Sequence, residues 1–343
     1  MKKRVKRILC LLLAAVMLLG LAACGEREGA PGGKDAAGGG RDTTKATIAF
    51  SSEPVSMSVW DNEEMAPIYS AYLTNSFLMK IDPETMEAVC DLAESYEAVS
   101  DSEYVFHLRK GVKFHHGKEF KAEDVVATYE KIIQYPGSSP YVSAIVSVEA
   151  ADDYTVRFTM NGPYPNLIYD LGYKYWFIYP ADLIESGHDF ASEPVGTGPF
   201  KMSEWSQGDY IIYERFDGYW DKDHMPGIET LTWKVIPEGA SRTIALQTGE
   251  VDIVYEVETA DITRIQEDVD LTLEEITSVE NYCLTFNSDL EPFNDANFRS
   301  AIAYALDRDA IVQGALDGYG IANGTSIAMG YWGSCEDGAF TYD

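Results

Sequence analysis

The sequence contains few cysteines, few basic residues and no apolar run long enough for repeated membrane spans. Lys and Arg number 26 against 56 Asp and Glu, which gives a net charge of −30. Such a surface repels phosphate backbones, so the charge argues against nucleic acid as a partner. A composition that is 46% hydrophobic and 24% charged also argues against a disordered chain and against a multi-span membrane protein.

Several enzyme and cofactor motifs are missing as well. Neither Gly-x-Ser-x-Gly nor His-Glu-x-x-His occurs, so no nucleophile or metalloprotease frame supports catalysis. Gly196-Thr197-Gly198 lacks the rest of a phosphate-binding motif. His115 and His116 are adjacent, and neighbouring side chains on an extended segment point in opposite directions, which disfavours a shared metal. We therefore expect no enzyme activity, no cofactor and no metal.

The amino terminus carries the strongest signal in the chain. Five bases within the first seven residues precede the apolar run Ile8–Leu19, which predicts a secretory signal peptide over residues 1–23. Leu21-Ala22-Ala23-Cys24 resembles a bacterial lipobox, in which Cys24 is lipidated after cleavage behind Ala23. An ordinary signal peptide with an incidental cysteine is the alternative.

Residues 24–45 follow as a predicted flexible linker, because Gly, Ala and charged residues dominate them without apolar periodicity. The mature protein is thus expected outside the cytoplasm, on the periplasmic or outer face of the cell membrane and held there by lipid. Cys90, Cys283 and Cys335 remain in the body. Three cysteines without metal-ligand spacing allow at most one disulfide, and isolated buried thiols are the favoured interpretation.

The body alternates strand and helix patterns, which predicts a mixed α/β fold. No fixed-period repeat suggests a solenoid or propeller. Strands are expected at residues 47–50, 104–109, 154–160, 210–216, 231–236 and 251–254. Helices are expected at residues 66–79 and 122–134, around Ile244, around Phe298 and from Arg308, with Asp307 as the cap of the last. We also expect Gly196 and Gly198 to adopt backbone angles that a Cβ atom forbids.

Four ordered segments resemble extracytoplasmic solute-binding proteins of family 5, which serve peptide and nickel ABC importers. They are Tyr104–Val125 (YVFHLRKGVKFHHGKEFKAEDV), Pro194–Trp220 with Gly-Thr-Gly-Pro-Phe and Gly-Tyr-Trp, Ala245–Ile253 (ALQTGEVDI), and Asn281–Arg308 with Asn-Tyr-Cys-Leu-Thr-Phe-Asn and Arg-Ser-Ala-Ile-Ala-Tyr-Ala-Leu-Asp-Arg. Lys121 stands where the family has a Thr or Ser helix cap.

The resemblance implies a type II periplasmic-binding-protein-like clamshell of two lobes. The first lobe would span residues 46–285, with an inserted subdomain at about 80–190. Residues 286–343 would begin a second lobe that is incomplete in this chain, as in a truncated sequence. The hinge would lie at residues 282–287, where Tyr282, Leu284 and Phe286 alternate as in a strand.

By the same resemblance, the protein is expected to be the substrate-binding lipoprotein of an ABC importer. A monomer would capture an oligopeptide or dipeptide and deliver it to the permease subunits in the membrane. Nickel chelates or oligosaccharides are the alternative ligands, and a secreted hydrolase such as a glycosidase is the alternative class. The expected ligand-binding residues are Glu53, Pro54, Val55, Ser56, Tyr282 and Asn287.

Overall fold

The computed structural model describes residues 42–60, 64–277, 280–328, 334 and 340–342. The chain divides into two units, Met1–Asp42 and Thr43–Asp343. The predicted signal peptide, Cys24 and the linker up to residue 41 lie outside the described residues, as does Cys335. None of the helices in the described ranges has the length and apolar character needed to cross a membrane.

A five-stranded mixed sheet forms one part of the second unit, in the order β11-β1-β10-β9-β8. β1 runs parallel to β10 and to β11, whereas β9 is antiparallel to both β10 and β8. The alternating pattern of the sequence explains the buried face, since Tyr213 and Ile211 lie opposite Leu231 and Trp233 and all four are buried. The strands are β1 (Lys45–Phe50), β8 (Phe200–Ser206), β9 (Tyr210–Arg215), β10 (Thr230–Val235) and β11 (Ile253–Val254).

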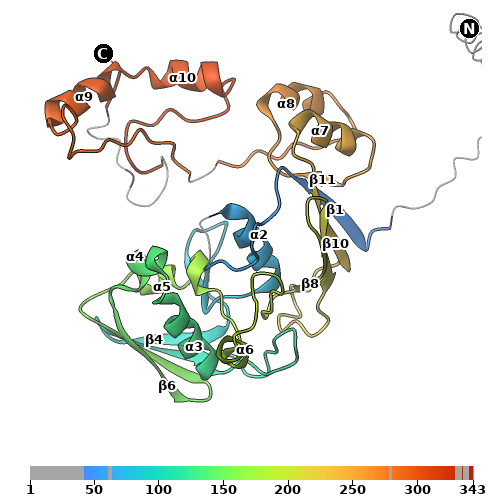
Figure 1. Ribbon diagram of the computed structural model, residues 1–343, viewed down its shortest axis with the longest axis vertical. Helices are drawn as coiled ribbons and strands as arrows, with labels where there is room; N and C mark the ends of the chain where they lie inside the picture. The colour runs from blue at the N-terminus through green and yellow to red at the C-terminus, as the bar shows by residue number, and fades with distance from the viewer. Residues whose placement is uncertain (1–41, 61–63, 278–279, 329–333, 335–339, 343) are drawn as a thin grey trace, which may run out of the picture. The chain divides into compact units, whose positions relative to one another are not determined.

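A four-stranded antiparallel sheet forms the other large part, in the order β4-β5-β7-β6. Phe106 and Phe158 on neighbouring strands are fully buried, with ring centroids 5.3 Å apart. Helix α3 (Ala122–Ile132) packs against β6 and β7, and Figure 1 shows it lying over this sheet. The strands are β4 (Ala93–Ser100), β5 (Glu103–Leu108), β6 (Ile145–Asp152) and β7 (Thr155–Met160).

The remaining elements connect or cover these sheets, and α7 and α8 lie beside β11 (Figure 1). Asp307 Oδ1 accepts a hydrogen bond from Ala310 N, 2.9 Å away, which confirms the predicted cap. The elements are α2 (Met65–Thr74), β2 (Met79–Ile81), β3 (Ala88–Cys90), η1 (Pro136–Ser138), α4 (Ser139–Val142), α5 (Leu167–Asp170), η2 (Lys174–Trp176), α6 (Ala181–Ser186), α7 (Gly239–Gln247), α8 (Thr259–Gln266), α9 (Ala296–Ala305) and α10 (Arg308–Ala315).

Two local predictions were wrong. The helix expected to reach residue 79 ends at Thr74, because Asn75 turns extended and its side-chain amide donates to Ile178 O at 3.2 Å. Gly196 and Gly198 do not have positive φ angles. They are needed instead for close approach, since a Cβ atom on Gly198 would lie 2.5 Å from the Thr74 carbonyl carbon and one on Gly196 would lie 2.2 Å from Thr74 O.

Lys121 leaves α3 without a hydroxyl cap, and an acidic side chain takes over part of that role. Asp124, in the first turn, accepts a hydrogen bond from Lys121 N at 2.8 Å. The same carboxylate accepts from Ala181 N at 2.8 Å and from Lys118 Nζ at 3.2 Å. Asp124 therefore satisfies the helix start and ties it to α6.

Candidate functional site

The parallel strands of the five-stranded sheet all end at the same edge, which we call the carboxyl edge. Phe50, Val235 and Val254 are the last residues of β1, β10 and β11. The segments that follow these strands, at residues 51–60, 236–238 and 255–258, therefore leave the sheet side by side. In sheets with parallel strands, ligands bind outside the carboxyl ends of the strands, which makes this edge the candidate site.

Four aromatic side chains line the carboxyl edge: Phe50, Tyr69, Trp233 and Tyr255, together called the aromatic wall. Phe50 stacks on Trp233 with ring centroids 3.7 Å apart, and it lies 5.2 Å from the ring of Tyr255. The hydroxyl groups of Tyr255 and Tyr69 are 3.0 Å apart. Tyr255 is 39% exposed, so the wall offers a ring face and a hydroxyl group to a ligand.

Tyr69 of the wall has a pKa above its ordinary value. Burial raises the pKa of Tyr69, and the hydrogen bond with Tyr255 raises it further. The negative charge of Glu280 acts in the same direction on the pKa of Tyr69, which also puts Glu280 within electrostatic range of the wall. The phenol of Tyr69 is thus a neutral group that can donate or accept a hydrogen bond.

The segment after β1 is bonded to the sheet at residues 52 and 53, whereas the main chain of Val55 forms no hydrogen bond with the described part of the chain. Glu53 accepts hydrogen bonds from Trp205 Nε1 at 2.8 Å and from Gly208 N at 2.7 Å. Trp233 Nε1 donates to Ser52 O at 3.1 Å. These bonds fix residues 52 and 53 to the sheet, so the carboxylate of Glu53 anchors the segment and is not free to hold a ligand.

Beyond Glu53 the segment belongs to no strand, and its backbone bends at Val55 and at Met57. Pro54 is buried, whereas Val55 is 75% exposed. Ser56 Oγ accepts from Ser58 N at 3.1 Å, and Met57 N donates to Ala191 O at 2.8 Å. Within the described ranges, no protein group bonds to the main chain of Val55, so its N–H and C=O groups are available to a ligand.

Arg242 of α7 joins two of the segments that leave the carboxyl edge, and sequence reasoning missed it. Its side chain is 3% exposed, and Nη1 donates to Ile236 O at 3.0 Å and to Pro237 O at 2.9 Å. Nη2 donates to Glu256 O at 3.1 Å. The only signal available in the sequence was an arginine in a helix of small residues in an acidic chain.

The predicted hinge residues do not gather with the others. Tyr282 is 92% exposed, and Asn287 is exposed with its Oδ1 accepting from Asp289 N at 3.0 Å. The predicted strand through Tyr282, Leu284 and Phe286 was wrong: residues 280–287 form no strand. Among the residues described, no strand lies beside them to supply ladder hydrogen bonds.

His115 and His116 form their hydrogen bonds with residues outside the carboxyl edge. His115 bonds to Gly198 O and Gly196 N, whereas His116 lies 3.3 Å from Asp182. No cluster of His, Cys, Asp and Glu in the described part of the chain has the form of a metal site. Cys90 and Cys283 are free thiols, and Cys283 is exposed, so the prediction of buried thiols was wrong for it.

Comparison with known proteins identifies the family to which this fold belongs. Residues 87–343 match the family described as bacterial extracellular solute-binding proteins, family 5 Middle. The chain belongs to this family. The dipeptide-binding protein of Escherichia coli (strain K12) is 32% identical over 287 residues, which cover 76% of this chain and 53% of that protein. The chain spans about half the length of the curated relatives it matches.

Solved structures give the same result for the fold. AgaA from A. tumefaciens R10, in complex with agropinic acid, is 30% identical with a TM-score of 0.78, and the match covers 87% of this chain and 62% of that one. The oligopeptide-binding protein AppA from Bacillus subtilis, in complex with a nonapeptide, is 29% identical with a TM-score of 0.74 and coverages of 87% and 61%. The predicted α/β class and type II periplasmic-binding-protein fold are confirmed, and the family is one of binding proteins, not of enzymes.

Proposed function

We propose that this chain is the extracytoplasmic receptor of an ABC importer and that it binds an oligopeptide or dipeptide at the carboxyl edge. The observation that carries the proposal is the unpaired main chain of the exposed residue Val55, which lies between the anchored Glu53 and the bonded Met57. An extended peptide can add to such a segment through main-chain hydrogen bonds, which is a recurring mode of peptide recognition. Tyr255 and Tyr69 would contribute the adjacent ring face and hydroxyl groups.

The proposal includes the organisation expected from the sequence. Residues 1–23 are a signal peptide, Cys24 carries the lipid, and residues 24–45 form the linker of a monomer held at the membrane. Residues 46–285 form the first lobe, with the inserted subdomain at about 80–190, and residues from 286 begin the second. The separation of the four-stranded sheet from the five-stranded sheet supports the inserted subdomain.

Closure of two lobes on the peptide would produce the form that the permease recognises. In that closed state Tyr282 and Asn287, which lie on the hinge segment, would face the ligand from the side opposite Val55. A ligand shifts the open and closed populations only through its different affinity for the two forms. One solved relative holds a nonapeptide and another holds agropinic acid. Since ligands differ among relatives, nickel chelates and oligosaccharides stay open as alternative ligands.

The test is calorimetric titration of the natural gene product with a dipeptide and a nonapeptide, with mass spectrometry of the recovered peptides. We expect saturable binding at one site and chemically unchanged peptide. Val55→Pro removes the main-chain N–H and should weaken binding by about tenfold or more, the effect of one well-formed hydrogen bond in a desolvated site. Val55→Ala keeps the N–H and is the matched control, with a change below about threefold.

Cleavage of the peptides would overturn the receptor assignment. Equal binding by the Val55→Pro and Val55→Ala variants would overturn the placement of the peptide on this segment.

A further inference from the structure

A cavity of about 460 Å³ lies outside the set of residues that form the carboxyl edge. Its lining comes from three places in the sequence: β4, the segment after β5, and the segment after β9. This volume suits a small solute. The lining residues are Glu94, Arg109, Lys110, Gly111, Val112, Gly218, Tyr219, Trp220 and Lys222.

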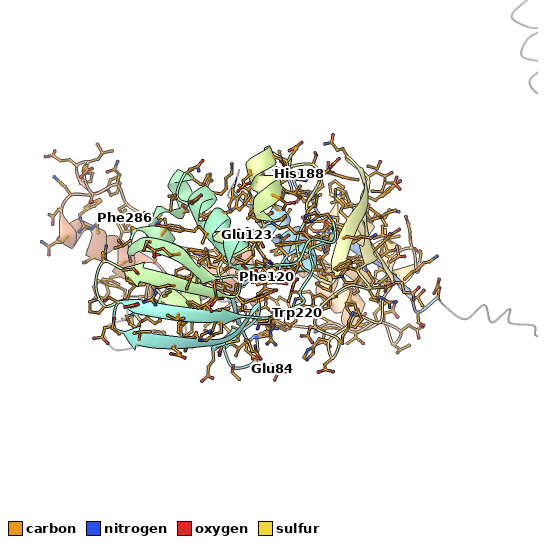
Figure 2. The ribbon with its side chains drawn as sticks, turned by 90° about the horizontal axis from the view of Figure 1, so that it is seen from below. Glu84, Phe120, Glu123, His188, Trp220 and Phe286 are labelled. Carbon is orange, nitrogen blue, oxygen red and sulfur yellow. The ribbon has the colours of Figure 1, made fainter. Side chains whose placement is uncertain are left out.

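Arg109 is held in place by two contacts that leave the end of its side chain available. Its Nε donates to Asp91 O at 2.6 Å, and its guanidinium carbon lies 5.0 Å from the ring centroid of Trp220, which is labelled in Figure 2. In the part of the chain that the structure describes, no protein atom accepts a hydrogen bond from Nη1 or Nη2 of Arg109. A planar guanidinium held in this way loses little side-chain freedom when it binds a ligand with its two terminal nitrogens.

The other charges around the cavity favour a single negative charge on the ligand. Lys222 Nζ is tied to Asp217 O at 2.8 Å, and Lys110 Nζ lies 5.2 Å from the ring centroid of Tyr154. Together with Arg109 they make three cations in the lining, whereas the chain as a whole carries −30.

Three carboxyl groups limit this positive charge. Glu94 is exposed and also lines the cavity. Asp91 is buried beneath Arg109 with Lys80 3.7 Å away, and Asp221 lies within electrostatic range of Asp91 and Tyr219. The three cations of the lining and Lys80 exceed these three carboxyl groups by one positive charge, which attracts a monoanion and gives a dianion less advantage.

We propose that this cavity binds a small carboxylate, with both oxygens on the terminal nitrogens of Arg109. The fork of an arginine matches the two oxygens of a carboxylate, and the paired, charge-assisted hydrogen bonds are stronger than neutral ones. Tyr219 and Trp220 supply ring surface for the organic part of the ligand. This second site is independent of the peptide site proposed at Val55, so either one can fail without the other.

The test uses propionate, and inorganic phosphate as the competing anion, at constant ionic strength. Saturation-transfer NMR and titration calorimetry on the natural gene product should show saturable propionate binding at one site. Arg109→Lys keeps the charge but removes the fork, and should weaken propionate by about tenfold or more. Arg264→Lys is the matched control: Arg264 pairs with Asp261 within α8, and this variant should bind as the parent does.

A second measurement uses the parent protein alone, so it does not depend on whether the Arg109→Lys variant folds. In protein with isotope-labelled arginine, propionate should shift the side-chain resonances of Arg109 and leave those of Arg264 unchanged. Absence of saturable propionate binding, tighter binding of phosphate than of propionate, or equal propionate affinity in the Arg109→Lys and parent proteins would each overturn the proposal.

Discussion

The two large sheets differ in how their strands are connected. In the four-stranded sheet, all neighbours are antiparallel, and the β4–β5 and β6–β7 pairs are short hairpins. In the five-stranded sheet, β1 is distant in sequence from β10 and β11 and runs parallel to both, so three connecting segments leave the same edge. Hairpins satisfy their own main chain, whereas parallel strands release longer segments. The comparison explains why the unpaired main chain of Val55 lies at the five-stranded sheet.

The largest effect should come from the core of the four-stranded sheet. Phe106 is fully buried against Phe158, and Phe106→Ala removes that packing and leaves a cavity, so the free energy of unfolding should fall by about 3–5 kcal/mol. Urea unfolding measures the change. Val99→Ala on β4 is the control, because Val99 is 56% exposed, and it should change stability by less than about 0.5 kcal/mol. Similar losses for both variants would mean that this sheet does not have the core described.

The next effect is a pH dependence at the contact between the segment after β5 and the segment leading into β8. His115 Nε2 donates to Gly198 O at 3.1 Å and Nδ1 accepts from Gly196 N at 3.4 Å, so the ring is neutral. Burial lowers the pKa of His115, the hydrogen bond with Gly198 O raises it, and the charges of Lys201 and His116 lower it, so that together these effects bring it from 6.5 to about 4. The unfolded chain therefore binds the proton more readily between these two values, and the stability contributed by His115 is present above pH 6.5 and lost as pH falls to 4.

The measurement compares the parent with His115→Gln in urea at pH 7, 5 and 4. The difference in unfolding free energy between the two proteins should shrink by up to about 3 kcal/mol over this range. The comparison between two proteins cancels the carboxyl groups that titrate in both. A difference that stays constant with pH would show that His115 is not buried as a neutral ring.

A smaller loss is expected where the chain passes close to the end of α2. Gly198→Ala would put a Cβ atom 2.5 Å from the Thr74 carbonyl carbon, so the backbone must move, at a cost of about 1–3 kcal/mol. Thermal unfolding measures this cost. Gly227→Ala is the matched control, because a Cβ atom there meets nothing within 4 Å. If both variants melt at the same temperature as the parent, the close approach of residues 74 and 198 is not maintained in solution.

The smallest change tests the carboxyl edge itself. Arg242→Lys cannot reach the carbonyl groups of Ile236, Pro237 and Glu256 together, so the loops after β10 and β11 should loosen and stability should fall by about 1–2 kcal/mol. Amide exchange should accelerate at residues 236, 238 and 255–258 and stay unchanged in β5 and β7. Uniform acceleration in both sheets would remove the distinction between them.

Sequence patterns predicted the regular elements well where neighbours in the chain decide the structure. The strand at 104–109 and the helix from 122 are confirmed because alternation and helical spacing determine which side chains are buried. Contacts between residues distant in the sequence could not be predicted from these local patterns. The end of α2 depends on Asn75 meeting Ile178, and the need for glycine at 198 depends on Thr74.

The residues of the candidate site also fall into two groups: those that the sequence predicted, and those that depend on contacts distant in the chain. Residues 53–56 were identified through family resemblance, but the anchoring of Glu53 by Trp205 and Gly208 joins positions about 150 apart in the sequence. Tyr255 and Arg242 could not be assigned to the site from their neighbours in the chain, since the parallel pairing of β1 with β10 and β11 brings the segments that they belong to or contact together. The strand predicted through Tyr282 failed because alternation describes a strand only where another strand pairs with it.

The most direct test of the account is a crystal structure of the natural gene product with a bound dipeptide. We expect the peptide main chain to hydrogen-bond to the segment at Val55, with the ring of Tyr255 in contact with the ligand. A dipeptide bound at the four-stranded sheet, with the carboxyl edge of the five-stranded sheet empty, would contradict the account.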